Sequence, residues 1–359
     1  MARVAVVRPE DYERLAAFMA AFPGVKPCTA ARWRSRMAAW WERNPAFEES
    51  FPRGWVVDDG GTIAGFFGSI PLRMQLGGTE TTVFCTTTWR VAAEHRGKTL
   101  ELKLRQLKAH EDYLHFSTTP MKDLVPLLQR FKYRQIERGP DAKYQSQLIF
   151  DCANFWRVHY RDRPIVARLA TVAAPALAVV QAIRTRGLKA TLADVRELGH
   201  ADEAFDALWQ RTRTRFANTN VRTAEVVNWY CFTIQPIDRK LFAAYVRGEL
   251  VGYLVLLVKE EPMLRYLECV DAWIDPAADE AAVLAALLAR AADAARRENF
   301  DRLMFPHFDT HTAALLHAIG LIRGPGWERR EYYKGPTALM DLITPETSYF
   351  VRAQGDYGL

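Results

Sequence analysis

GWVVDDGGTIAGFFGSIPLR (54–73) and AAYVRGELVGYLVLLVKE (243–260) are two stretches of this chain that share one pattern. Each has a short apolar run, a turn that contains glycine, and a longer apolar run in which a glycine precedes an aromatic residue. Apolar runs joined by such turn residues are typical of β-hairpins. Each stretch therefore predicts a pair of antiparallel strands.

The elements that follow each hairpin also correspond. After the first hairpin the sequence predicts a strand (80–91), a helix (99–111), a strand (113–117), a helix (121–130) and two strands (133–136, 145–150). After the second hairpin it predicts a strand (265–276), a helix (280–297), a strand (302–308) and a helix (310–319). Matched positions such as Gly65 and Gly252 keep an offset of about 185 residues, which favours a duplicated domain over chance similarity.

The fold class expected from this order is α/β (α+β), with two similar domains, each a mixed and mostly antiparallel sheet flanked by helices. We place the first domain at 1–150, a helical linker at 151–188 and the second domain at 189–359. The tail (345–359) is expected to add a strand to the second sheet. The spacing of Leu100, Leu104 and Leu107 is what predicts the helix 99–111.

Composition is that of an ordinary globular protein, with 48 basic and 42 acidic residues and a formal charge of +6. The basic residues are scattered, which argues against a DNA-binding stripe and favours a solvated surface able to attract a small anion. The five cysteines have neither zinc-site nor disulfide spacing, and the N-terminal residues do not resemble a signal peptide. A cytoplasmic protein with reduced thiols is expected.

The segment 165–183 is mostly apolar but contains Arg168 and Pro175, and arginines flank it on both sides. Three interpretations stay open at this point. The segment is a helix between the domains, a weak contact with an anionic membrane surface, or a membrane span.

The stretch VAAEHRGKTLE (91–101) joins the third predicted strand to the helix that follows. Amide groups at a helix start are unpaired and favour negative charge. A glycine allows close approach of a ligand, and Arg96 and Lys98 add charge-assisted contacts. The turn is therefore predicted to bind an anion such as a pyrophosphate.

These residues resemble the GNAT superfamily, whose pyrophosphate loop follows the fourth strand as (Q/R)-x-x-G-x-(G/A). Arg96 matches the first motif position, whereas Thr99 and Glu101 stand where the family has glycine and glycine or alanine. The tyrosine that often protonates the CoA thiolate in this family is replaced by Leu128 in the first domain and Leu316 in the second. In the second domain two carboxylates, on Asp275 and Asp279, take the place of the basic turn, so we expect any acyl-CoA site in the first domain.

The resemblance implies an acyl-CoA site in the first domain between the strands 80–91 and 113–117, which correspond to the fourth and fifth strands of the family. The backbone around Trp89, Arg90 and Val91 is expected to hold the pantetheine arm. The pyrophosphate is expected on Arg96, Gly97, Lys98 and Thr99.

His115 and Glu94 are candidate general bases, and Ser117 lies on the same side of its strand as His115. Glu268 and Asp271, on the matching strand of the second domain, are candidates for binding a substrate amine. No metal site is expected.

The function implied is transfer of an acyl group from acetyl-CoA or a longer acyl-CoA to a small-molecule amine by direct attack. Two alternatives stay open. Fem-type aminoacyl-transferases also have two GNAT-like halves and use aminoacyl-tRNA, which the basic charge would suit. The third possibility is a duplicated GNAT-like scaffold that binds a ligand or partner without catalysis.

Overall fold

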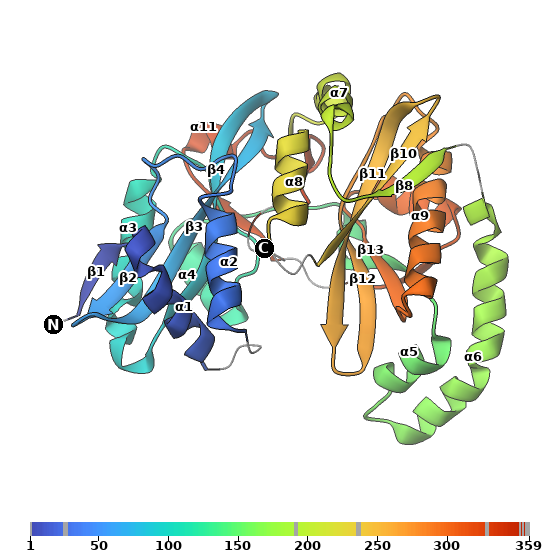
Figure 1. Cartoon of the computed structure of the whole chain (residues 1–359), viewed down its shortest axis with the longest axis horizontal. Helices are drawn as coiled ribbons and strands as arrows, with labels where there is room; N and C mark the ends of the chain where they lie inside the picture. Colours follow the sequence, from blue (N-terminus) through green and yellow to red (C-terminus); the bar gives the residue numbers. More distant parts are fainter. Residues whose placement is uncertain are drawn as a thin grey trace.

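A computed structural model describes residues 2–23, 28–189, 193–234, 238–326, 330–351, 353 and 355. The tail predicted to form a strand (345–359) is described only in part, because residues 352, 354 and 356–359 lie outside these ranges. Two mixed sheets stand side by side with helices packed against them, which confirms the predicted fold class (Figure 1).

The first sheet has nine strands, in the order β1-β2-β3-β4-β5-β15-β6, with β9 paired to β3 and β16 paired to β9. These strands are β1 (Arg3–Val6), β2 (Gly54–Asp59), β3 (Thr62–Leu76), β4 (Thr79–Val91), β5 (His115–Ser117), β6 (Arg134–Gln135), β9 (Asn218–Asn220), β15 (Tyr332–Lys334) and β16 (Ser348–Tyr349). The predicted hairpin of the first domain is β2–β3, and its longer strand follows the glycine turn as expected.

The second sheet has seven strands, in the order β14-β7-β13-β12-β11-β10-β8. These are β7 (Tyr144–Ile149), β8 (Asp194–Leu198), β10 (Arg239–Val246), β11 (Glu249–Glu261), β12 (Leu264–Ile274), β13 (Arg302–Pro306) and β14 (Ile322–Pro325). The second predicted hairpin is β10–β11.

Helices cover both sheets. The α-helices are α1 (Tyr12–Ala21), α2 (Ala30–Trp40), α3 (Thr99–Ala109), α4 (Val125–Arg130), α5 (Cys152–His159), α6 (Pro164–Arg184), α7 (Glu203–Thr212), α8 (Ala224–Phe232), α9 (Glu280–Arg297), α10 (Thr310–Ala318) and α11 (Thr337–Met340). Short 3₁₀ helices are η1 (Pro9–Asp11), η2 (Ala93–Lys98), η3 (Lys122–Leu124), η4 (Pro140–Lys143), η5 (Arg186–Lys189) and η6 (Arg213–Arg215).

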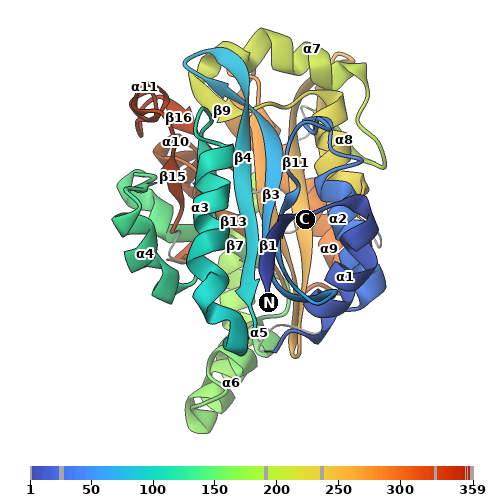
Figure 2. The ribbon, with the colours of Figure 1, turned by 90° about the vertical axis from the view of Figure 1, so that its left-hand side faces the viewer.

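The alternation of side chains along β3 divides the first domain into two layers. Phe66 packs in the main core with residues of α1 and α2, whereas Phe67 packs with Leu102 of α3 on the opposite face. Figure 2 shows α3 and α4 on one side of this sheet and α1 and α2 on the other.

Strands are exchanged between the two halves of the chain, so sheet membership does not follow the boundary at residue 150. The strand predicted to end the first unit is β7, and it pairs with β13 and β14 of the second sheet. In return, β15 pairs with β5 and β6 of the first sheet, and β9 pairs with β3. The expectation that the tail extends the second sheet is wrong for its described part, because β16 pairs with β9 in the first sheet.

Helix α3 forms where the leucine spacing predicted a helix, but its buried face is not the face of Leu100 and Leu104. Leu100 and Leu104 are 50% and 51% exposed, and the buried side chains are those of Leu102, Lys103 and Gln106. The apolar spacing did not identify the buried face because two of the side chains that α3 turns inward are polar.

Candidate functional site

Strand β4 contains a β-bulge. Phe66 of β3 pairs with Arg90 and Gly68 pairs with Thr87, so β4 has one more residue than β3 over this stretch. Within it, Thr88 has a left-handed backbone with a φ of 47°. This conformation is strained for a β-branched residue, and such strain and such bulges are concentrated at functional sites.

Beside the bulge, β4 and β5 part from one another. They run parallel and pair at Phe84 with His115 and at Cys85 with Phe116, before the bulge is reached. β5 then ends at Ser117, whereas β4 continues to Val91 and leads through η2 into α3. We call the opening between the two strands, bordered by Thr88, Trp89 and His115, the first wedge.

A buried polar cluster lies on the α3 side of the first wedge. The ammonium of Lys103 donates hydrogen bonds to Gln106 Oε1 at 2.8 Å and to the Tyr133 hydroxyl at 2.5 Å. Its nitrogen is 5.7 Å from the centre of the Trp89 ring, and the His115 ring is 5.3 Å from that of Tyr133. Side chains from β4, β5, α3 and the residue just before β6 therefore meet here.

Burial changes the protonation of this cluster. It lowers the pKa of Lys103 to about 7, with a further contribution from the charge of Lys334. It also lowers the pKa of His115 well below its usual value, and Lys103 adds to that effect. His115 is therefore neutral at physiological pH, and Lys103 is the group that changes protonation near pH 7.

Several buried polar atoms around the first wedge have no hydrogen-bond partner among the described residues. They are Thr88 Oγ1, Trp89 Nε1, Gln106 Nε2 and both ring nitrogens of His115. Nearly all buried polar groups in folded proteins are paired, so a group of unpaired ones is characteristic of a place that receives water or a ligand.

The predicted anion-binding turn is the 3₁₀ helix η2, which continues directly into α3. Arg96 and Gly97 are exposed, and the amide of Thr99 donates to the carbonyl of Arg96. Glu101 lies along the helix, 2.9 Å from Lys98 Nζ and 3.6 Å from Arg105. Hydrogen bonding to Lys98 lowers the pKa of Glu101. Its charge is thereby compensated within α3.

The other residues predicted for this site are spread over two faces and the surface. The Arg90 guanidinium lies 5.5 Å from the Trp33 ring of α2, on the face opposite Trp89. Val91 pairs with Gly65, Ser117 pairs with Tyr332 of β15, and Glu94 is exposed on η2. Trp89 lies beside Lys103 and His115 lies beside Tyr133, so both border the buried polar cluster, whereas Arg90 and Glu94 lie elsewhere.

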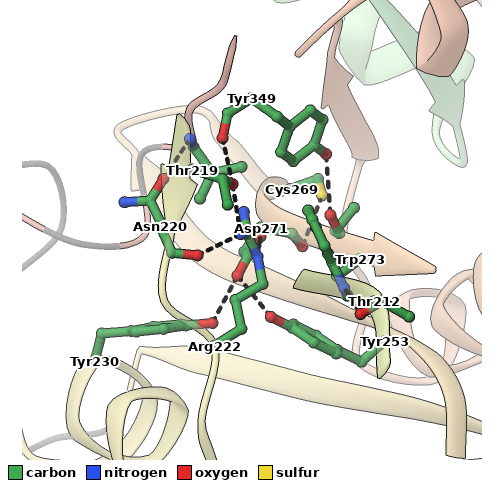
Figure 3. A network of polar contacts seen from close by, with 12 residues as sticks. Thr212, Thr219, Asn220, Arg222, Tyr230, Tyr253, Cys269, Asp271, Trp273 and Tyr349 are labelled. Atoms are coloured by element: carbon green, nitrogen blue, oxygen red, sulfur yellow. Dashed lines mark hydrogen bonds and ion pairs between the residues drawn. The ribbon is translucent and has the colours of Figure 1, made fainter. Parts of the chain in front are cut away.

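The corresponding strand of the second sheet, β12, also has a bulge, at Val270, and parts from β13 after Glu268. We call this opening the second wedge. Asp271 is buried here: its carboxylate accepts hydrogen bonds from Arg222 Nε at 3.2 Å, Tyr230 at 2.8 Å and Tyr253 at 2.9 Å (Figure 3). Asp271 is therefore satisfied within the protein, which disfavours its expected role in binding a substrate amine.

The second wedge is filled by the protein's own side chains. The Tyr349 hydroxyl donates to the carbonyl of Ala272 at 2.9 Å, and the Arg222 guanidinium lies 4.2 Å from the Trp273 ring. Glu268 is also buried, 2% exposed, on the paired part of β12. A cavity of about 30 Å³ beside Trp273 and Tyr349 has room for little more than a water molecule.

A larger cavity, of about 320 Å³, lies where segments of both halves meet. Three carboxylate residues line it, Glu137, Asp309 and Glu346, together with His311. Phe350 also lines the cavity, and its ring is 5.9 Å from that of Phe116 in β5. The cavity therefore lies next to the face of β5 that is opposite His115. Its lining also includes Arg138, whose charge is compensated by Glu331, so carboxylates are in excess.

Comparison with solved structures gives similar folds over nearly the whole chain. A GCN5-related N-acetyltransferase from Kribbella flavida has a TM-score of 0.58 at 13% identity, covering 94% of this chain and 72% of that one. N-myristoyltransferase of Saccharomyces cerevisiae with bound myristoyl-CoA has a TM-score of 0.56 at 10% identity, covering 92% and 82%. The chain has the GNAT fold. No family model matches the sequence, and no curated protein matches it in sequence.

The bulged strand β4, which leads through η2 into α3, is the strand at which the sequence predicted the thioester site. The sequence singled out Trp89 and His115, which border the polar cluster, but not Thr88, Lys103, Gln106 or Tyr133. Lys103 and Gln106 are spaced about one helical turn apart and flank the apolar Leu102. This spacing is the one sequence signal for the cluster, but polar residues on a solvated helix face have the same spacing. The sequence contains no signal for the carboxylates of the 320 Å³ cavity, because these residues come from three separate segments.

Proposed function

We propose that the first wedge binds an acyl thioester, acyl-CoA, and that the protein transfers the acyl group to an amine. The observation that carries this proposal is the bulge at Thr88 beside strands that part, with unpaired buried polar atoms around the opening. The neighbours of known structure are N-acyltransferases by name, which supports the same reaction class.

The chemistry follows from the opening of the strands. A bulge leaves backbone amides outside the ladder, and amides aimed at a thioester carbonyl stabilise the negative charge that develops on its oxygen. The neutral amine nitrogen attacks the carbonyl carbon, the carbon–sulfur bond breaks, and the thiolate of CoA leaves and takes up a proton. The proton lost by the attacking nitrogen goes to a base, so no covalent enzyme intermediate is needed.

Lys103 is better suited than His115 to accept that proton. Its pKa of about 7 leaves a substantial neutral fraction at physiological pH, whereas the lowered pKa of His115 makes that imidazole a weak base. His115 then serves as a neutral hydrogen-bonding group within the first wedge.

The acceptor amine is assigned to the 320 Å³ cavity. An amine is a cation before it loses its proton, and the carboxylates of Glu137, Asp309 and Glu346 are complementary to that charge. The cavity adjoins Phe350, which contacts Phe116 on the face of β5 opposite His115 and Lys103. The amine would therefore reach the thioester and Lys103 through the opening between β4 and β5.

Calorimetric titration with acetyl-CoA and with a long-chain acyl-CoA tests the thioester site. Arg96→Ala is expected to weaken binding about tenfold, because it removes a charge-assisted contact to the pyrophosphate. Lys108→Ala, at the other end of α3 and also exposed, is the matched control and is expected to bind as the unchanged protein does. Absence of binding by either thioester would contradict the proposal and favour the tRNA-dependent or non-catalytic alternatives.

The acceptor assignment needs a separate measurement. With a bound acyl-CoA, a panel of small amines is screened by release of free CoA thiol. For an amine that reacts, Glu346→Gln is expected to raise KM with little change in kcat, because the substitution removes an attractive charge from the cavity. An unchanged KM in Glu346→Gln, Glu137→Gln and Asp309→Asn would place the acceptor elsewhere.

A further inference from the structure

Helix α6 has one narrow face that binds it to the rest of the protein. Ala167, Ala174 and Gln181 are its buried residues, and they are spaced seven residues apart. The side-chain amide of Gln181 accepts from the amide of Ile149 at 2.8 Å and donates to the carbonyl of Ile149 at 2.7 Å. The helix is therefore fastened along this face to α5 and to β7.

The opposite face of α6 is exposed and mostly apolar, with Arg168 as a basic residue between Ile165 and Val172. Ile165, Val172 and Val179 lie two residues before each buried position and are 75%, 80% and 58% exposed. Two residues of an α-helix turn the side-chain direction by about 200°, so these residues face directly away from the protein. Eight of the fourteen exposed large hydrophobic residues in the described part of the chain lie on this one helix.

Basic residues flank this apolar stripe. Arg161 and Arg163 precede it, Arg184 and Arg186 follow it, and all four are exposed. The sequence has no acidic residue from Arg163 to Lys189. Figures 1 and 2 show α6 at one edge of the molecule, away from the first sheet, so a flat surface can approach it.

Among the described helices, α6 is the one long and apolar enough to cross a membrane by length and composition, with a mean hydropathy of 1.7. Crossing would require the Gln181 amide to leave its two hydrogen bonds to Ile149 and enter hydrocarbon, which is unfavourable. Lying in the plane of a membrane keeps those bonds and buries the outward stripe.

We propose that α6 docks this protein on the surface of an anionic lipid bilayer. The stripe of Ile165, Val172 and Val179 enters the boundary between headgroups and acyl chains, and the flanking arginines bind anionic headgroups. Charge complementarity favours lipid over a second copy of the chain, because a copy would bring the same arginines together. This inference does not depend on the proposed acyl transfer.

Vesicle sedimentation with the full-length protein tests the proposal, comparing phosphatidylcholine vesicles with mixed phosphatidylcholine and phosphatidylserine vesicles. The protein is expected to bind the mixed vesicles more tightly, and less so as salt is raised. The variant Ile165→Ser/Val172→Ser/Val179→Ser is expected to lose about tenfold or more in affinity. Arg184→Gln/Arg186→Gln is expected to lose most of the preference for phosphatidylserine.

The matched control is Val6→Ser/Met121→Ser/Leu342→Ser, which removes three exposed apolar residues from the rest of the surface and is expected to bind like the unchanged protein. Equal binding by the α6 serine variant, or no binding of the unchanged protein to either vesicle, would overturn the proposal. So would a concentration-dependent dimer, detected by light scattering, that the α6 serine variant abolishes, since the stripe would then join two copies of the chain.

Discussion

The two wedges have similar strand geometry but different side chains. In each sheet a bulged strand parts from a parallel neighbour and leads toward a helix. At the first wedge, polar atoms of Trp89 and His115 are buried without partners. At the second wedge, Tyr349 and Arg222 occupy the opening and Asp271 accepts three hydrogen bonds. The fold thus has two places where parallel strands part, and the side chains at these two places differ.

The backbone differs as well. The bulge of β4 contains Thr88 in the left-handed region, whereas within the described chain the bulge of β12 is formed without a left-handed residue. Strain and unpaired polar atoms reduce stability, and both are found at the first wedge. The second wedge is packed and largely hydrogen-bonded, although Arg222 Nη2 is also buried without a partner among the described residues. We therefore expect substitutions at the second wedge to affect mainly stability, and substitutions at the first to affect mainly binding.

The largest effect is expected for Asp271→Asn. This change leaves the Arg222 guanidinium, 1% exposed, without its countercharge, and breaking a buried ion pair typically lowers the free energy of unfolding by about 3–5 kcal/mol. Urea unfolding measures it. The matched control is Asp194→Asn, which breaks an exposed pair with Arg196 in the same sheet and is expected to change stability by less than about 1 kcal/mol. Similar small losses in both variants would show that the second wedge is not a core.

A change of opposite sign is expected for Lys103→Met at the first wedge. Removing a buried amine relieves its desolvation, and loss of the hydrogen bonds to Gln106 and Tyr133 offsets part of the gain. We expect a net increase of about 1–2 kcal/mol in the free energy of unfolding near pH 6. Acyl transfer should fall at the same time, because the proton acceptor is gone.

The pH dependence of that gain has a definite sign. The pKa of Lys103 is about 7 in the folded state, below the ordinary value of 10.5 that applies when the chain is unfolded. Its destabilisation is therefore complete below pH 7 and disappears as the pH rises toward 10.5, where both states are neutral. The advantage of Lys103→Met should shrink over this range in unfolding experiments. Lys108→Met, on the exposed face of α3, should show neither the gain nor the trend.

Sequence patterns predicted the elements that depend on local signals. The strand β3 belongs to the predicted hairpin and follows its glycine turn. The helix α9 has the predicted bounds, and Asp279 caps it by accepting from the amide of Ala282 at 3.0 Å. The exchange of β7 and β15 could not be predicted in this way. Whether a strand of three residues such as β15 pairs with one sheet or the other depends on packing across the whole molecule.

The first wedge was located in sequence by the basic turn at Arg96, but its chemistry was only partly predicted. His115 was found because histidine is a conspicuous base. Lys103 was missed because a lysine on a helix with exposed leucines looks solvated, and its burial follows from how α3 rotates on the sheet. Asp271, the residue predicted to bind the acceptor, lies on the matching strand. Its carboxylate is taken up by Tyr230 of α8, Arg222 just before α8 and Tyr253 of β11.

The smallest effect on stability is expected for Thr88→Gly, which tests whether the bulge of β4 is strained. Glycine adopts a φ of 47° freely, so the substitution relieves strain of about 1 kcal/mol, and the greater freedom of glycine in the unfolded chain offsets part of it. Thr87→Gly is the matched control: Thr87 is buried and pairs with Gly68, so its loss should lower stability by about 1–2 kcal/mol. Acyl-CoA affinity should survive Thr88→Gly if backbone amides hold the thioester. Equal destabilisation by the two variants would mean that the bulge is relaxed, and the two wedges would then differ in their side chains alone.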